Sequence, residues 1–355
     1  MKFRLVIALL LGSMAVMPAH AAERPLLIAH RGASADRPEH TLMAYKLAIE
    51  QGADVIEPDL VSTKDGHLVA RHENEISGTT NVADHPEFAA RRATKMIDGQ
   101  KMEGWFTEDF TLAELKTLRA RERLPQLRPA NAAYDGQEAI PTLVEILALV
   151  KAEQVRTGRR IGLYPETKHP SYFRGIGLPL EEPLLAALTK AGYREKSDPV
   201  FIQSFEVGNL EAIRPRTKLR LIQLMAPEAG PPDKPGQTYA AMATPDGLKA
   251  IARYADGIGV ERAMVIPRTA TGGLAAPTSL VPDAHAAGLK VHIWTFRPEN
   301  YFLPTEFRAG DDLRARGDGA GEIRAFLATG IDGLFSDSVT EAVKALQPPT
   351  GVPRP

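Results

Sequence analysis

The chain of 355 residues is long enough for one large domain or two ordinary ones, and with 44% hydrophobic and 25% charged residues it has the composition of a globular protein with a buried core. Its formal net charge is -1 and no long basic run occurs, which argues against a nucleic-acid partner. Cysteine is absent, so disulfides, thiolate metal sites and cysteine nucleophiles are excluded together.

The first 21 residues have the features of a cleavable signal peptide. Lys2 and Arg4 give a positive start, residues 5–17 are apolar, and Ala19-His20-Ala21 matches a small-x-small cleavage site. The apolar run is too short for a membrane-spanning helix, and a buried N-terminal helix is the alternative interpretation. We therefore expect secretion, a mature chain from Ala22 onward, a periplasmic location and no stable membrane anchor.

Strand-length apolar runs then alternate with amphipathic helical patterns. This alternation predicts parallel strands, and eight of them favour an α/β fold of the (β/α)8 TIM barrel type over residues 22–346, ahead of a doubly wound open sheet. The expected strands are 26–29, 54–61, 160–165, 200–205, 219–225, 256–260, 290–296 and 331–335, and the clearest helices are 41–51, 142–153, 180–191 and 322–329.

A further strand, 67–72, is predicted to return antiparallel beside strand 54–61. Only residues 62–66 separate the two, whereas a parallel crossover needs about a dozen residues. The turn-forming sequence Thr63-Lys64-Asp65-Gly66 fits a hairpin. This hairpin would bring His72 beside Glu57 and Asp59 at one end of the barrel.

Three segments depart from the regular pattern. Residues 73–110 have weak periodicity and are expected to form a long excursion over the barrel end, and residues 297–319 form a second long loop after a strand. Residues 347–355 are a Pro-rich tail that we expect to be frayed.

Carboxylates in the predicted strands indicate a metal site. Glu57 and Asp59 are separated by one residue, so their side chains point to the same face. Burying two carboxylates together is costly without a positive partner, and a hard divalent cation, Ca²⁺ or Mg²⁺, suits clustered carboxylate oxygens. Glu166 ends another predicted strand and adds a third carboxylate at the same rim. Neutralisation by Arg or Lys alone is the alternative.

Two histidines and two cations lie at the same predicted rim. His30 and His72 each end a strand and can act as base and acid near neutral pH, although zinc ligation is left open. The planar fork of Arg31 suits phosphate oxygens, and Lys168 follows Glu166 by two residues. Together these residues indicate metal-assisted cleavage of a phosphodiester.

Other strand-end residues are candidates for the substrate wall or for structural roles. Gln203 and Phe205 close one strand, and Trp294 lies near the end of another, where it is either a wall of the site or a core residue. Asp332 and Asp337 bracket the last predicted strand, and we interpret them as structural.

Several short motifs follow one another along the mature chain, and they are His30-Arg31-Gly32, Pro38-Glu39-His40-Thr41, Glu57-Pro58-Asp59, Thr63-Lys64-Asp65-Gly66, His72, Glu166-Thr167-Lys168, Gln203-Ser204-Phe205, Trp294-Thr295 and Asp332-Gly333. In this order they resemble the glycerophosphodiester phosphodiesterase family. The signal sequence and the long segment after His72 are similar to the periplasmic branch of that family. Two departures are His40, where members often have Asn, and Glu73, where they often have Asp.

The resemblance implies a TIM barrel, with residues 73–110 as a small inserted subdomain, that hydrolyses deacylated phospholipids to sn-glycerol 3-phosphate and an alcohol. It implies metal binding by Glu57, Asp59 and Glu166, and acid–base catalysis by His30 and His72. Arg31 and Lys168 would hold the phosphate, and Gln203, Phe205 and Trp294 would contact the substrate. The attacking hydroxyl is either the glycerol 2-OH, which would give a cyclic phosphate, or water.

The resemblance also indicates the cofactor and partners. One divalent cation is expected, with Ca²⁺ favoured because the periplasmic branch uses it and Mg²⁺ as the alternative. The expected partner is a small-molecule glycerophosphodiester, and a homodimer is a possible assembly. Two other functions stay open: a phospholipase of the phosphatidylinositol-specific or sphingomyelinase D type, which the mean hydropathy of -0.19 does not favour, and a non-catalytic periplasmic binding protein for glycerophosphodiesters.

Overall fold

The computed structural model describes residues 24–347. The expected signal peptide and nearly all of the Pro-rich tail lie outside the described residues. Among the described residues, no helix combines the length and the apolar character that crossing a bilayer requires.

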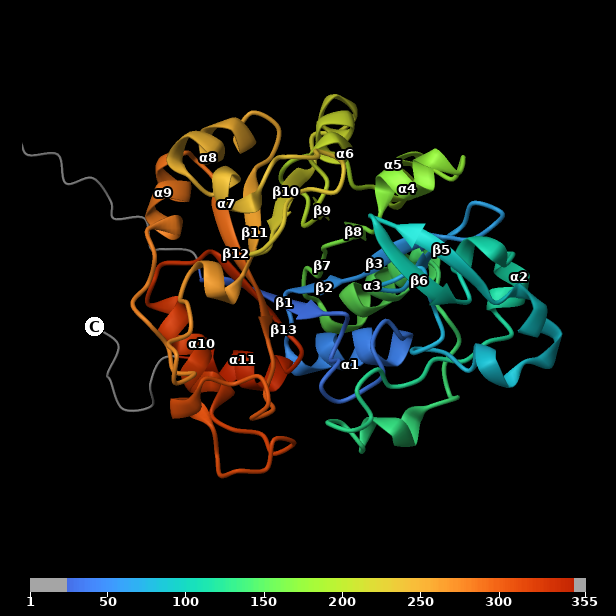
Figure 1. The fold of residues 1–355 in the computed structure, drawn as a ribbon, viewed down its shortest axis with the longest axis horizontal. Helices are drawn as coiled ribbons and strands as arrows, with labels where there is room; N and C mark the ends of the chain where they lie inside the picture. Colours follow the sequence, from blue (N-terminus) through green and yellow to red (C-terminus); the bar gives the residue numbers. More distant parts are fainter. Residues whose placement is uncertain (1–23, 348–355) are drawn as a thin grey trace, which may run out of the picture.

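Parallel strands close into a barrel at the centre of the molecule (Figure 1). β1 pairs with both β13 and β2, and parallel pairings connect all the strands between them around the ring. The predicted TIM barrel is therefore confirmed. Its strands are β1 (Leu26–His30), β2 (Val55–Glu57), β3 (Asp59–Ser62), β7 (Gly162–Leu163), β8 (Glu166–Thr167), β9 (Phe201–Ser204), β10 (Arg220–Met225), β11 (Gly257–Glu261), β12 (Lys290–Phe296) and β13 (Gly333–Ser336).

Two of the predicted strands are each interrupted once. Pro58 separates β2 from β3, and Tyr164 and Pro165 separate β7 from β8. Proline has no backbone N–H to donate to a ladder. The carbonyls of both prolines still accept bonds, from the backbone N–H of Glu166 and of Gln203 respectively, so the ring continues across the breaks.

Helices surround the barrel and begin at capping residues that the sequence provides. Thr41 caps the first of them through its hydroxyl, and Thr142 and Glu145 form a reciprocal capping box at another. The helices are α1 (Leu42–Gln51), α3 (Leu143–Thr157), α4 (Pro170–Gly175), α5 (Glu181–Ala191), α6 (Val207–Ile213), α7 (Tyr239–Met242), α8 (Pro245–Ile251), α9 (Leu280–Ala286), α10 (Gly319–Leu327) and α11 (Val339–Leu346).

Two apolar clusters stabilise the barrel. The larger one fills the space between the strands and the surrounding helices. The smaller one consists of inward-pointing side chains and fills the barrel interior, so the barrel is a packed core and not a pore. Its members are Ile28, Val55, Tyr164, Phe201, Ile222 and Phe335.

The predicted hairpin after the second strand is present. β4 (Leu68–Ala70) pairs antiparallel with β3, and Leu60 lies opposite Ala70. Gly66 has a φ of +80° in the turn, a backbone conformation that glycine adopts without strain. The backbone N–H of Arg71 donates to the carbonyl of Asp59 at 3.0 Å, so the chain returns to the carboxyl end of the barrel just before His72.

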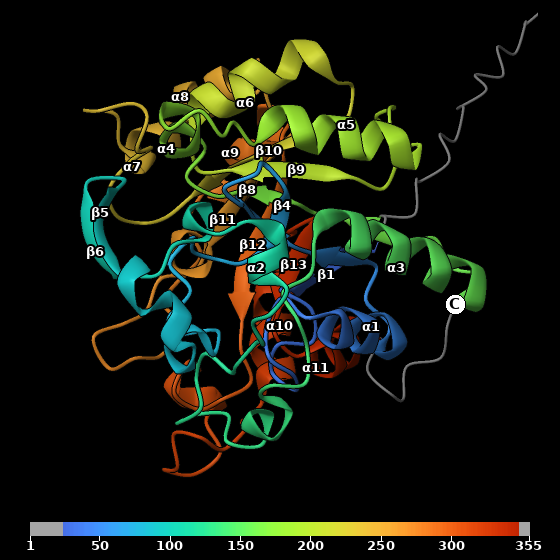
Figure 2. The same ribbon diagram turned by 90° about the vertical axis from the view of Figure 1, so that its right-hand side faces the viewer.

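The segment between β4 and α3 forms an insertion that continues well beyond residue 110. It contains the antiparallel pair β5 (Ala93–Ile97) and β6 (Gln100–Gly104), the short helix α2 (Leu112–Leu115) and several 3-10 turns. An isolated bridge from Thr80 to Ala120 ties its two halves together. In Figure 2 the β5–β6 hairpin lies on one side of the molecule and the far ends of α3 and α5 lie on the other.

Candidate active site

The strand ends surround a cavity of about 390 Å³ at the carboxyl end of the barrel. Nine of the ten residues predicted for the site line this cavity, and the tenth, Asp59, lies in the carboxylate cluster beside it. The lining residues are His30, Arg31, Glu57, His72, Glu166, Lys168, Gln203, Phe205, Leu224, Trp294, Thr295, Arg297 and Phe335.

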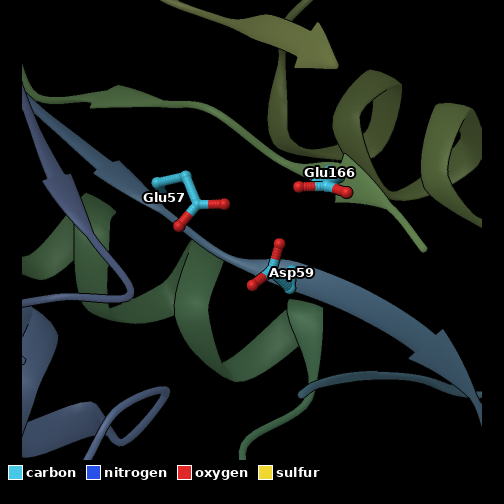
Figure 3. A group of neighbouring side chains, drawn as sticks. All are labelled: Glu57, Asp59 and Glu166. Atoms are coloured by element: carbon cyan, nitrogen blue, oxygen red, sulfur yellow. The ribbon is translucent and has the colours of Figure 1, made fainter. Parts of the chain in front are cut away.

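Three carboxylates converge at one side of the cavity. Figure 3 shows Glu57 at the end of β2, Asp59 at the start of β3 and Glu166 on the neighbouring β8, with their carboxylates directed toward a common point. One oxygen of each lies within 4.8 Å of the other two. Asp59 and Glu166 are cross-strand partners in register, which explains why residues so distant in sequence meet.

Every one of these carboxylates is buried and has a fixed partner. Arg31 donates its backbone N–H to Glu57 Oε2 at 2.9 Å, and Gln203 Nε2 donates to Glu57 Oε1 at 3.0 Å. Lys168 Nζ lies 2.8 Å from Glu166 Oε1. The partners orient the carboxylate oxygens, as ligands of a metal are oriented by the groups behind them.

His40 is the buried partner of Asp59. Its Nε2 lies 2.9 Å from Asp59 Oδ2, and its Nδ1 lies 2.7 Å from the hydroxyl of Tyr45. The departure from asparagine at this position therefore keeps a group that can donate to the carboxylate. His40 does not line the cavity.

The electrostatics of the cluster favour a cation. Burial and the charge of Asp59 raise the pKa of Glu166 to about 8, although Lys168 opposes the shift. Burial and the neighbouring carboxylates also raise the pKa of Glu57 well above its usual range. Asp59 takes the negative charge, because Lys168 and the hydrogen bond from His40 hold its pKa well below the usual range despite burial. Three hard oxygen donors with excess mutual repulsion fit a divalent cation.

Each histidine of the cavity is held by its own carboxylate. His30 Nδ1 lies 2.6 Å from Asp337 Oδ1, and His72 Nδ1 lies 2.5 Å from Glu73 Oε1. With Nδ1 engaged in both rings, Nε2 is the nitrogen left for proton exchange. Asp337, interpreted from the sequence as structural, is the side chain that orients His30. Glu73 reaches His72 despite its extra methylene.

Burial and nearby cations keep both rings neutral. Burial, followed by the charge of Arg31, lowers the pKa of His30 to about 4. Burial and the charges of Arg31 and Lys168 lower the pKa of His72 to about 3. An anionic substrate would oppose these shifts and make it easier for one ring to carry a proton.

The cations and aromatic side chains complete the wall. Arg31 Nη1 donates to Glu39 Oε2 at 3.0 Å, and its Nε lies 3.3 Å from Asp59 Oδ2. Phe205 and Trp294 meet edge to face with ring centroids 5.8 Å apart. The lining thus combines cations and carboxylates, which suit a phosphate, with aromatic rings, which suit a carbon skeleton.

Sequence reasoning missed a set of residues that stand behind or beside the predicted ones. Arg297 directly follows β12 as Arg31 follows β1, and this parallel position was the one signal that could have identified it. Asp337 likewise directly follows β13 but was interpreted as structural, and Glu39 belongs to a quoted motif without an assigned role. Arg123, Arg128 and Glu299 have no local signal, because they reach the site from the insertion or from a loop. The missed set is Glu39, Arg123, Arg128, Arg297, Glu299 and Asp337.

Comparison with known proteins gives the family. Residues 30–341 match the model of the glycerophosphoryl diester phosphodiesterase family. The chain belongs to this family. A glycerophosphodiester phosphodiesterase of Arabidopsis thaliana is 36% identical over 327 residues, which cover 88% of this chain and 84% of that protein. A glycerophosphodiester phosphodiesterase of Treponema pallidum is 30% identical, with 85% of this chain and 88% of that protein covered.

Solved structures of the glycerophosphoryl diester phosphodiesterase family share the fold. A putative member from Silicibacter pomeroyi superposes with a TM-score of 0.62 at 21% identity and covers 91% of this chain and 92% of its own. A phosphodiesterase from Oleispira antarctica, in complex with the product sn-glycerol-3-phosphate, gives a TM-score of 0.59 at 20% identity, with 91% of this chain and 96% of that chain covered.

Proposed function

We propose that this family member hydrolyses glycerophosphodiesters to sn-glycerol 3-phosphate and an alcohol with the help of one divalent cation. The observation that carries the proposal is the meeting of three buried carboxylates and two carboxylate-held histidines around one cavity. Family membership, the names of the relatives and the sn-glycerol-3-phosphate bound to the Oleispira antarctica protein support the substrate class.

Glu57, Asp59 and Glu166 would hold the cation, which when bound supplies positive charge beside the phosphate. Arg31 and Lys168 would bind phosphate oxygens and orient the phosphorus. Phe205 and Trp294 would pack against the carbon skeleton, and Gln203 would keep Glu57 in place. Ca²⁺ is our proposed ion and Mg²⁺ the alternative, since three carboxylates suit either.

The two histidines would divide the proton transfers. One accepts the proton of the attacking hydroxyl at Nε2, and the other, in its protonated form, donates a proton to the alcohol oxygen as the bond between that oxygen and phosphorus breaks. The attacking hydroxyl is either the 2-OH of the glycerol, with a cyclic phosphate that water then opens, or water itself. Both routes end in sn-glycerol 3-phosphate.

A coupled assay for sn-glycerol 3-phosphate tests the proposal. The purified chain from residue 22 onward should release this product from glycerophosphocholine, lose the activity after chelation, and regain it with Ca²⁺ or Mg²⁺. Activity on phosphatidylinositol or sphingomyelin vesicles without activity on glycerophosphocholine would instead support a phospholipase. Tight binding of glycerophosphocholine with no product would support a binding protein.

We also propose that the protein is exported and acts in the periplasm, because its first 21 residues fit a cleavable signal peptide. N-terminal sequencing of protein recovered from a periplasmic extract should give Ala22 as the first residue. Recovery of the uncleaved chain from the cytosol would contradict the proposal.

A further inference from the structure

Two arginines of the insertion reach the carboxyl end of the barrel. Arg123 and Arg128 lie five positions apart in the stretch between α2 and α3, which contains no barrel strand. Neither lines the cavity, so neither is placed to touch a bound substrate. Each one contacts the carboxylate that holds one of the two cavity histidines.

Arg123 binds the carboxylate behind His72. Its Nη2 donates to Glu73 Oε2 at 2.7 Å, while Glu73 Oε1 holds His72 Nδ1. The same guanidinium donates from Nε and Nη2 to both oxygens of Glu39, at 2.8 and 2.6 Å. Glu39 in turn accepts from Arg31, so Arg123 is linked both to a histidine and to the proposed phosphate-binding arginine.

Arg128 binds the carboxylate behind His30. Its Nη2 donates to Asp337 Oδ2 at 2.6 Å, while Asp337 Oδ1 holds His30 Nδ1. Its Nε donates to Glu299 Oε1 at 2.7 Å, and its Nη1 donates to the carbonyl of Ser34 at 2.9 Å. The side chain is only 5% exposed, so these bonds form in a dry environment where they orient strongly.

The backbone that presents the two arginines is itself braced. Glu122 accepts from the backbone N–H of Leu124 at 2.8 Å and from Asn131 Nδ2 at 2.9 Å. Asn131 Nδ2 also lies 3.1 Å from the carbonyl of Ser34. Residues 122–131 are therefore held together by internal hydrogen bonds through Glu122, and Asn131 attaches them to the loop that follows β1.

We propose that residues 122–131 position both histidines of the active site, with Arg123 acting through Glu73 on His72 and Arg128 acting through Asp337 on His30. Asp337 uses one oxygen for His30 and the other for Arg128. Glu73 binds Arg123 through both oxygens, Nη2 at Oε2 and Nη1 at Oε1, and Oε1 also holds His72. A carboxylate bound on both oxygens cannot rotate away, and the imidazole ring that it holds keeps its orientation. The inference rests on the proposed acid–base roles of the histidines, and it makes Arg123 and Arg128 positioning residues.

The test compares R123Q and R128Q with R121Q as a matched control. Arg121 belongs to the same stretch and pairs with Asp84, but its side chain is 40% exposed and it contacts none of these carboxylates. R123Q and R128Q should each lower kcat by about 10–100-fold, the usual effect of losing a group behind an active-site ligand. R128Q should change KM much less than kcat, whereas R123Q should also raise KM because Arg31 loses support. R121Q should behave like the wild type.

Nitrogen-15 NMR of the histidine rings gives a readout independent of turnover. R123Q should shift the ring signals of His72 and leave those of His30 in place, and R128Q should do the reverse. Unchanged ring signals in a folded R123Q would overturn the proposal, as would equal shifts in R121Q. If R128Q does not fold, R123Q, whose arginine is 27% exposed in the wild type, decides the matter.

The same spectra separate this inference from the proposed function. A wild-type protein that releases no sn-glycerol 3-phosphate, yet has ring signals that respond to R123Q as described, would refute the function and leave the positioning intact. Normal hydrolysis by the wild type, together with histidine ring signals that do not change in R123Q, would support the function and refute the positioning.

Discussion

The two histidines of the cavity illustrate what a local pattern can and cannot indicate. Their positions at strand ends predicted that both reach the same rim, and the structure places both in one cavity. The pairing of His30 with Asp337 does not follow from a local pattern, because the two residues lie 307 positions apart, although Asp337 also follows a strand end. Only the pairing of β13 with β1, which closes the barrel, brings the Asp337 carboxylate to the imidazole of His30.

His30→Ala and His72→Ala should each lower kcat by about 10²–10⁴-fold, the range for loss of a general acid or base. The coupled glycerol 3-phosphate assay measures this, and circular dichroism should show an unchanged fold because both side chains border a cavity. His67→Ala is the control, since its side chain is 54% exposed at the β3–β4 turn. Wild-type activity in either cavity variant would remove that histidine from the mechanism.

The elements themselves were largely readable from periodicity. All eight predicted barrel strands are present, because continuous apolar runs are what strands buried on both faces require. The short helices α6, α8 and α9 were not predicted, since seven residues carry too little periodicity to detect. The expected insertion ended at residue 110, whereas the irregular segment continues to α3. Its second half was not predicted, because it is held by long-range ion pairs, such as that of Arg123 with Glu39, which leave no local pattern.

Gly32 joins β1 to α1 and should be intolerant of any side chain. Its φ is +91°, and a Cβ would lie 2.7 Å from the carbonyl carbon of Ala44. Gly32→Ala should lower the free energy of unfolding by about 1–3 kcal/mol through backbone strain and by a further ~1–3 kcal/mol through overpacking. Urea denaturation measures the loss.

Gly66→Ala is the matched control for this prediction. Its φ of +80° is equally unusual, but a Cβ there meets nothing within 4 Å. It should cost about 1–2 kcal/mol from the left-handed conformation alone. If both variants lose the same free energy of unfolding, the close contact of the added Cβ with α1 does not contribute to the destabilisation of Gly32→Ala.

At the scale of the whole molecule, the site joins residues from both ends of the described chain. His30 and Asp337 meet across the closing strands, and the carboxylates of β2, β3 and β8 form the cluster in the same site. A cation bound by these carboxylates would therefore stabilise the entire barrel and not one loop, because a ligand that binds only the folded state shifts the global equilibrium.

Ca²⁺ should raise Tm, and the increase should be larger at pH 8.5 than at pH 6.5. The raised pKa values of Glu166, about 8, and of Glu57 mean that the metal-free fold holds protons there at neutral pH, and a cation must displace them. In the unfolded chain these two carboxyl groups titrate near their ordinary pKa of 4.5. The metal-free fold therefore loses stability as pH rises from that value through the folded-state pKa of Glu166, about 8. Thermal melts with EDTA and with Ca²⁺ measure both effects.

Glu166→Gln supplies the control for the pH dependence. It removes a carboxyl group whose pKa is raised and, with it, one proposed metal ligand. The Ca²⁺-induced rise in Tm should therefore become smaller and depend less on pH. A rise in Tm that is independent of pH in the wild type would show that the cation binds elsewhere.

The attachment of the insertion to both histidine–carboxylate pairs limits which segments could replace it. A barrel of this kind cannot exchange its insertion freely, since a replacement must present two guanidinium groups at the positions of Arg123 and Arg128. Loss of one arginine would favour a compensating change in Glu73 or Asp337. A barrel that received a foreign insertion without these two groups should therefore lose the support behind both histidines.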